Sequence, residues 1–129
     1  RITMRKVFIS CTRPNMTDME QHAVMKKMES DLRNYNIQQV EGYFMGHKET
    51  SFMVSRVESL NPLLALATLY NQDSIMVVSS YGGVDIVSTD ETIDAEFIGA
   101  FKVTKTKPKG GDYSYNPRTQ DYYIVEDLT

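Results

Sequence analysis

The chain has little cysteine, little histidine and no tryptophan: its 129 residues include one cysteine and two histidines. A single cysteine cannot form an internal disulfide, which agrees with a reducing compartment. His22 and His47 have no metal-ligand spacing with each other or with Cys11, so we expect no metal cofactor. No apolar run approaches the length of a membrane span, and no signal-peptide pattern opens the printed sequence. These absences favour a location in the cytoplasm.

Positive charge is also scarce: 14 Lys and Arg residues compare with 17 Asp and Glu residues, and the formal net charge is −3. Proteins that bind nucleic acid usually carry a basic surface, so this class is disfavoured. The basic run alternates along one predicted strand, as expected of a solvated edge strand, and consists of Lys102, Lys105, Lys107 and Lys109. There is no phosphate-binding glycine loop of the Walker or Rossmann type. If the protein is an enzyme, its chemistry must need few protein groups.

What is present is the length and composition of one globular domain, spanning residues 1–129. The predicted elements, in chain order, are a strand over 6–12, a helix that begins within 13–21 and ends at 34–36, a hairpin over 41–57, a helix over 61–72, strands over 74–80, 84–89, 96–105 and 121–125, and a loop over 108–120.

Start signals and one apolar stripe support the two helices. Thr17 and Glu20 fit a capping box, while Asn61 is a candidate cap with Pro62 at the first helical position. The apolar stripe of the first helix consists of Val24, Met25, Met28, Leu32 and Tyr35. Cys11 lies inside the first strand, where we expect an inert core residue.

The order β-α-β-β-α-β predicts an α+β protein with a ferredoxin-like sandwich and a C-terminal β extension. Val7 and Ile9 can face the two helices, but Phe8 points to the other side, and residues 75–78 are apolar on both faces. Two helices cover only one face of a sheet, so the second face needs another cover. The late strands or another subunit would serve, and we favour subunits packed sheet to sheet in a closed ring.

Glu49 is the most informative position, because it stands at the root of an apolar strand in the predicted hairpin. The ordinary interpretation is an exposed residue that helps to end a hairpin, paired with Lys48 or Arg56. The functional interpretation depends on a resemblance.

Three segments carry that resemblance. The first, "VFISCTRPNMTD", has the order S-x-x-R-x-N-x-x-D, formed by Ser10, Arg13, Asn15 and Asp18. The second, "EGYFMGHKETSFMV", has G-x-aromatic followed by E-x-[ST]-apolar-x-V from Glu49. The third, "LALATLYNQDSIMVVSS", is a helix that leads directly into an apolar strand. In this order and spacing they resemble the phage-encoded S-adenosylmethionine lyases, formerly called hydrolases.

The resemblance implies a PII-like homotrimer of ferredoxin-like subunits with active sites at the subunit interfaces. The loop "MGHKET" would border the cleft, and Glu49 corresponds to the catalytic glutamate. The implied reaction cleaves S-adenosylmethionine to 5′-methylthioadenosine and L-homoserine lactone by attack of the substrate's own carboxylate, without a cofactor. Depletion of S-adenosylmethionine in the bacterial cytoplasm would counter the host's restriction and modification.

Five further residues are candidates for substrate binding. Tyr43 or Phe44 would flank the purine, and ordinary cross-strand packing is the alternative for each. Ser79 and Ser80 would present backbone or hydroxyl groups to adenine, and a strand end that makes a turn is their alternative. Ser10 lies on the same face as Phe8 and would look into the subunit interface.

Two other functions remain open at this point. One is a PII-like regulatory trimer that binds a nucleotide without catalysis and signals through the hairpin loop. The other is a ferredoxin-like interaction module with no small ligand. The shortness of "MGHKET" favours the enzyme, because a signalling loop is usually long and mobile.

Overall fold

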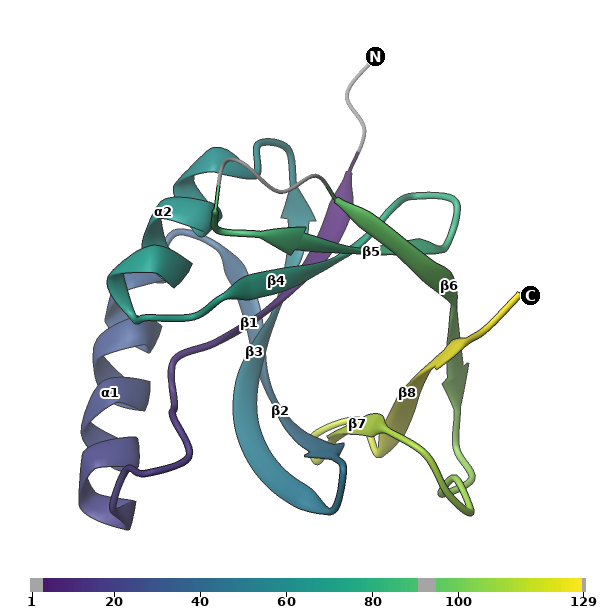
Figure 1. Cartoon of the computed structure of the whole chain (residues 1–129), viewed down its shortest axis with the longest axis horizontal. Helices are drawn as coiled ribbons and strands as arrows, with labels where there is room; N and C mark the ends of the chain where they lie inside the picture. Colours follow the sequence, from purple (N-terminus) through teal and green to yellow (C-terminus); the bar gives the residue numbers. More distant parts are fainter. Residues whose placement is uncertain (1–3, 91–94, 129) are drawn as a thin grey trace.

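The computed structural model describes residues 4–90 and 95–128. Within them the elements are, in chain order, β1 (Arg5–Ser10), α1 (Asp18–Asp31), β2 (Asn36–Phe44), β3 (His47–Val57), α2 (Asn61–Leu69), β4 (Ser74–Val78), β5 (Gly83–Ser88), β6 (Glu96–Thr104), β7 (Tyr113–Asn116) and β8 (Asp121–Glu126). The strands form a closed barrel in the order β1-β3-β2-β7-β8-β6-β5-β4, in which each pair is antiparallel (Figure 1).

The predicted ferredoxin-like, PII-like sandwich is wrong. The first six elements do follow the order β-α-β-β-α-β, but the sheet does not end at β4 and β2. From β4 it continues through β5, β6 and β8 to β7, which pairs with β2 and so closes the barrel. Closure removes both sheet edges and encloses the face that a two-layer sandwich would leave open.

The barrel wall separates two apolar clusters. Outward-facing side chains of β1 and β3 pack against α1 and α2, which lie on one side of the barrel (Figure 1). The inner cluster consists of Phe8, Val40, Met53, Val78, Val84 and Tyr123, and so draws on β1 to β5 and β8. Strands of the same chain therefore cover the second face of β1 and β4. Our preference for neighbouring subunits as that cover was wrong.

The predicted capping box of α1 is confirmed. The Thr17 hydroxyl accepts a hydrogen bond from the Glu20 backbone N–H at 3.1 Å, and the Glu20 carboxylate accepts one from the Thr17 N–H at 3.0 Å. Met28 and Leu32 of the predicted stripe are buried in the outer cluster. Cys11 is buried there too, and burial raises the pKa of its thiol to about 11, as expected of an inert core residue.

The start of α2 differs from the prediction. Asn61 is the first helical residue, Leu60 occupies the cap position, and no side chain caps the helix. Pro62 nevertheless lies in the first turn, where its missing N–H costs nothing. Within the described residues, neither helix has the length and apolar character needed to cross a membrane.

Two predictions for the late chain are also wrong. Part of the predicted loop over 108–120 is the four-residue strand β7, which ends at the fully buried Asn116. The Asn116 side chain donates a hydrogen bond to the Tyr123 hydroxyl at 3.2 Å and accepts one from the Arg118 N–H at 3.0 Å. The lysine-bearing strand β6 is no edge strand, because it pairs with both β5 and β8.

Candidate active site

The hairpin that carries Glu49 is tighter than predicted. Its turn consists of Met45 and Gly46, both with positive φ (50° and 82°), so β3 begins at His47. Such two-residue turns match the twist of antiparallel strands. The predicted loop "MGHKET" is therefore wrong beyond its first two residues, and Glu49 is the third residue of a strand. A paired strand holds a side chain more rigidly than a loop does.

Glu49 points to the inside of one end of the barrel. Side chains alternate along a strand, so Glu49, Ser51 and Met53 share the inner face of β3. A cavity of about 280 Å³ opens there. Its lining residues are Phe8, Ser10, Phe44, Glu49, Ser51, Gln72, Ser74, Met76, Ile86 and Ser114. The Ser10 hydroxyl, at the end of β1, donates a hydrogen bond to Glu49 Oε1 at 3.2 Å.

A second cavity of about 450 Å³ adjoins the first and shares four of its lining residues. It is lined by Phe44, Met76, Ile86, Ile98, Asp112, Tyr113, Ser114, Tyr123 and Val125. The Asp112 carboxylate accepts a hydrogen bond from the Met45 N–H at 3.1 Å. We call the two cavities together the acidic mouth. Among the described residues that line it, only Glu49 and Asp112 carry charge, and both are acidic.

Gly42 explains how Phe44 reaches the acidic mouth. It lies directly opposite Glu49 on β3 and Ser114 on β7. A Cβ at this position would overlap the Phe44 ring, which occupies the space that a side chain would fill. The spacing G-x-aromatic therefore has a physical reason: the glycine lets the aromatic ring fold inward beside Glu49.

The structure brings three of the predicted site residues together and separates three others from them. Glu49, Ser10 and Phe44 line the same cavity. Ser10 faces the barrel interior, although the prediction placed it at a subunit interface. Tyr43 lines neither cavity of the acidic mouth and stacks on Tyr113 with ring centroids 4.8 Å apart, as in its cross-strand alternative.

Ser79 and Ser80 lie at the opposite end of the barrel, where they line a different cavity. The Ser79 hydroxyl accepts hydrogen bonds from the N–H groups of Tyr81 (3.3 Å) and Gly83 (3.1 Å). These bonds agree with the alternative interpretation, in which Ser79 stabilises a turn at the end of the strand. Three stacked or tilted rings fill the barrel between the two ends, with centroids 5.5 to 5.9 Å apart; they belong to Phe8, Phe101 and Tyr123.

The ordinary interpretation of Glu49 predicted an ion pair with Lys48 or Arg56. Neither ion pair is present within the described residues. Lys48 instead bonds Glu41 at 3.1 Å, and this contact raises the lysine pKa. Arg56 lies at the far end of β3. Ser10 is the one hydrogen-bond partner of the Glu49 side chain within residues 4–90 and 95–128.

Sequence reasoning missed several residues of the acidic mouth: Ser51, Gln72, Ser74, Asp112 and Ser114. The signal for Ser51 was present, because it follows Glu49 at a strand spacing of two and thus shares its face. Asp112 and Ser114 carried no such signal, because they fall in the stretch that was predicted as a loop.

Fold and site together define a closed antiparallel barrel with a carboxylate-lined mouth, whose charge suits a small ligand of positive charge. The model of the S-Adenosylmethionine lyase family matches residues 7–126, and the chain belongs to this family. It is an enzyme that cleaves S-adenosylmethionine. A search of curated proteins found no match. Family membership confirms the predicted enzyme and disfavours the regulatory trimer without catalysis.

Proposed function

We propose that the acidic mouth binds S-adenosylmethionine and that the enzyme releases 5′-methylthioadenosine and L-homoserine lactone. A carboxylate oxygen of the methionyl group attacks the γ-carbon of the same group. A carbon–oxygen bond forms, the carbon–sulfur bond breaks, and its electron pair remains on sulfur, which leaves as a neutral thioether. The reaction needs no water, external base or cofactor.

The charge and polarity of the acidic mouth support this substrate. S-adenosylmethionine carries a sulfonium, an ammonium and one carboxylate, so its net charge is positive. Glu49 and Asp112 attract such a ligand, and no basic side chain among the described lining residues opposes it. The serine-rich part near Glu49 suits the methionyl group, and the apolar part beyond Phe44 suits adenosine.

The observation that carries the proposal is the hydrogen bond from Ser10 to Glu49 inside an open cavity. It engages Glu49 Oε1, and Oε2 accepts no hydrogen bond from the described residues, so Oε2 remains available to a ligand. Glu49 then holds the substrate ammonium, or lies near the sulfonium, and takes no covalent part. Orientation of this kind can contribute about 7–11 kcal/mol to an intramolecular reaction.

Chromatography of S-adenosylmethionine incubated with the protein tests the products. We expect methylthioadenosine and homoserine lactone to appear together from the start, with homoserine following later as the lactone opens. Homoserine that appears first, without the lactone, would contradict the proposed ring closure.

Heavy-oxygen water identifies the attacking atom. Lactone opening by attack at its carbonyl puts the label in the carboxyl group of homoserine. Direct hydrolysis at the γ-carbon puts the label on the γ-hydroxyl. We expect the carboxyl label, and a γ-hydroxyl label would overturn the lyase mechanism while leaving the substrate unchanged.

The biological role we propose is depletion of S-adenosylmethionine in the cytoplasm of a phage-infected bacterium. Restriction and modification systems that need this methyl donor would then fail. The proposal is supported by the family's substrate alone. Expression in bacteria with and without such a system tests it: we expect phage growth to improve only in the restricting strain.

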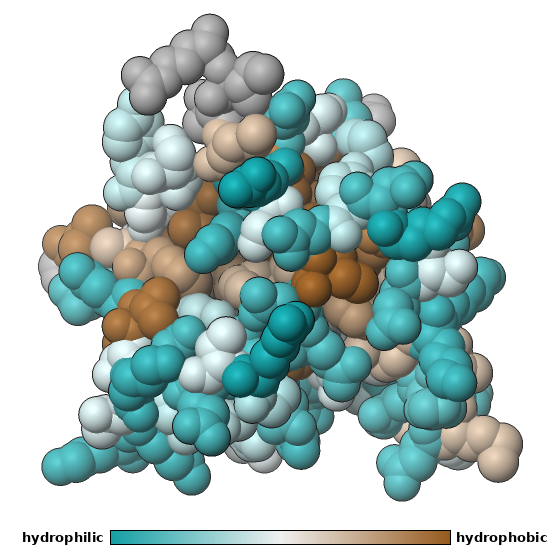
Figure 2. Space-filling model, turned by 180° about the vertical axis from the view of Figure 1, so that it is seen from behind, coloured by the Kyte–Doolittle hydropathy of each residue, from teal (hydrophilic) through white to brown (hydrophobic). Residues whose placement is uncertain are grey.

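We also propose the homotrimer with active sites at subunit interfaces, which the resemblance implied. The apolar second face of β1 and β4 no longer supports the trimer, because this face is the barrel interior. What supports it is the hairpin beside the acidic mouth, where Phe44 and Met45 are 37% and 88% exposed. The face in Figure 2 is mostly hydrophilic, with small separate hydrophobic areas. Light scattering at micromolar concentration decides: a stable, fully active monomer would exclude the trimer.

A further inference from the structure

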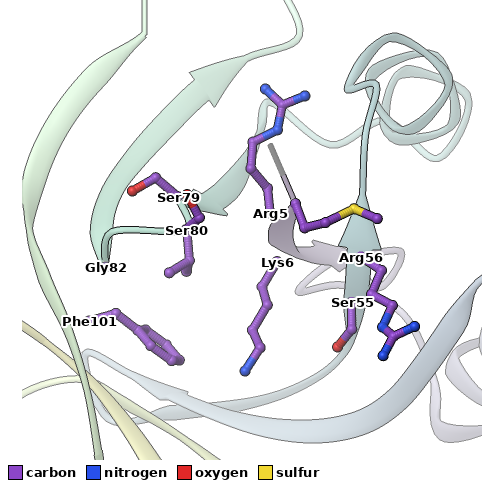
Figure 3. Close-up of a pocket in the computed structure, with 10 residues that line it drawn as sticks. Arg5, Lys6, Ser55, Arg56, Ser79, Ser80, Gly82 and Phe101 are labelled. Carbon is purple, nitrogen blue, oxygen red and sulfur yellow. The ribbon is translucent and has the colours of Figure 1, made fainter. Parts of the chain in front are cut away.

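The barrel end opposite Glu49 contains a cavity that the cleavage reaction does not use. Its volume is about 440 Å³, within the range of small-molecule sites. The lining residues are Met4, Arg5, Lys6, Ser55, Arg56, Val78, Ser79, Ser80, Gly82 and Phe101 (Figure 3). We call it the basic cavity.

Its charge is unusual for this chain. The described lining residues include three bases, Arg5, Lys6 and Arg56, and no acid, although the whole chain carries a net charge of −3. In Figure 3 the Lys6 side chain extends into the cavity between Phe101 and Ser55. Its Nζ lies 5.9 Å from the centroid of the Phe101 ring. The ring face attracts the ammonium by about 0.5–1 kcal/mol, which orients the lysine without neutralising its charge.

The backbone here departs from regular pairing. Arg5 pairs with Val57 but Val7 pairs with Val54, so two residues of β3, Ser55 and Arg56, stand opposite Lys6 alone. This is a β-bulge, a feature that re-aims side chains at barrel rims and binding sites. Arg56 also has φ of 57°, a conformation that residues other than glycine rarely adopt. The bulge thus places a second base and a hydroxyl beside Lys6.

Polar groups around the basic cavity have unused bonding capacity. Within the described residues, Arg5 Nε is a buried nitrogen without a hydrogen-bond partner, although the same guanidinium bonds the Glu58 carbonyl. The Ser79 oxygen accepts two backbone N–H groups, so its hydroxyl proton is left to donate. The Asp121 carboxylate bonds Lys105 at 2.7 Å, and this contact chiefly lowers the pKa of the Asp121 carboxyl, to which the charge of Lys6 adds a smaller part.

We propose that the basic cavity binds a small phosphate monoester. Lys6, Arg56 and several hydroxyls offer more donors than one carboxylate can use, whereas a phosphate presents three acceptor oxygens and up to two negative charges. The third base, Arg5, extends away from Lys6 in Figure 3 and bonds the Glu58 carbonyl. Lys6, Ser55 and Arg56 hold the phosphate. The apolar side of the cavity, formed by Phe101 and Val78, takes a flat organic group attached to it.

Titration of the amide NMR spectrum with inorganic phosphate and with phenyl phosphate tests this. We expect saturable shifts at Lys6, Ser55, Arg56 and residues 79–82, with tighter binding of phenyl phosphate because its ring contacts Phe101. Phenol alone should produce none of these shifts. Shifts at the acidic mouth only, or equal shifts with phenol, would overturn the proposal.

Matched variants give the second readout. Lys6→Gln and Arg56→Gln should each weaken phenyl phosphate binding by about tenfold or more, since each removes a charge-assisted hydrogen bond. Lys107→Gln, an exposed lysine outside the cavity, should bind as the unmodified chain does. Equal affinity in all three variants would overturn the proposal. If one cavity variant fails to fold, the other variant and the shift map still decide.

Discussion

The two ends of the barrel have opposite charge, although the same strands connect them. Strand β1 begins with Arg5 and Lys6 at the basic cavity and ends with Ser10 at the acidic mouth. Strand β3 runs the other way, from Glu49 to Arg56. Strand β3 therefore carries one charge sign to each end, whereas β1 carries bases to one end and a neutral hydroxyl to the other.

The rings of Phe8, Phe101 and Tyr123 keep the two ends apart. In a β-barrel of this size, side chains fill the interior, so opposite mouths are separate sites. The comparison teaches that one strand can carry charges of opposite sign to the two mouths of a small barrel, as β3 does with Glu49 and Arg56. Substitutions at each end should therefore act independently.

The largest expected effect is that of Glu49→Gln, which removes the charge but keeps the shape of the side chain. We expect turnover to fall at least about a hundredfold, the scale of losing one preorganised electrostatic group. Steady-state kinetics measures it, with circular dichroism to verify the fold. Glu58→Gln, an exposed acid at the opposite end, is the control and should stay active. Near-normal turnover in folded Glu49→Gln would remove Glu49 from the mechanism.

A methyl group at Gly42 should expel the Phe44 ring from the acidic mouth. We expect Gly42→Ala to lower the free energy of unfolding by about 1–3 kcal/mol, as overpacking does, and to raise KM. Denaturant unfolding and kinetics measure the two effects. Gly110→Ala is the matched control, because a Cβ there meets open space. An unchanged KM would mean that Phe44 does not contact the substrate.

Ser10→Ala should have a smaller effect, because it deletes one hydrogen bond to Glu49 Oε1 and leaves the charge in place. The expected loss in kcat is about threefold to tenfold, within the range of one ordinary hydrogen bond of about 0.5–1.5 kcal/mol, because the pair is exposed. A second test compares the turnover of the double variant, Ser10→Ala with Glu49→Gln, with that of Glu49→Gln alone. If Ser10 acts only by orienting Glu49, its loss should cost nothing further in the Glu49→Gln background.

Met45→Asn should stabilise the hairpin slightly without a change in activity. Met45 has φ of 50° and is 88% exposed, and asparagine tolerates this conformation better. We expect the free energy of unfolding to rise by about 0.5–1 kcal/mol. Thermal unfolding measures it. Destabilisation would indicate that the exposed methionine makes contacts in an assembly.

The smallest effect tests the separation of the two ends directly. Lys6→Gln should leave cleavage of S-adenosylmethionine unchanged within about twofold, because distant sites without shared partners act independently. A large loss of turnover would show that the aromatic rings couple the two ends.

Much of the site was predictable from the strand periodicity and the family resemblance. Ser10 and Phe8 share a face because they are two residues apart, and the glycine–aromatic spacing of residues 42–44 places a ring beside Glu49. Ser79 and Ser80 were assigned to the wrong end of the barrel. Their place follows from the antiparallel pairing of β4 with β1, in which Val78 lies opposite Lys6, so the end of β4 lies at the start of β1 and away from Ser10.

The sequence by itself determined the order of the first eight elements, the capping of α1, the apolar character of both faces of β1 and β4, and membership in the lyase family. These properties depend on neighbours within a few residues or on motif order. Only the tertiary structure decided that the sheet closes, because closure requires β7 to pair with β2 across a long stretch of chain. That pairing uses the four-residue strand Tyr113–Asn116, in which the buried residues are the polar Ser114 and Asn116, so the strand lacks the usual pattern of buried apolar residues. Its free energy comes from backbone hydrogen bonds and from burying the inner face, which no local segment reveals.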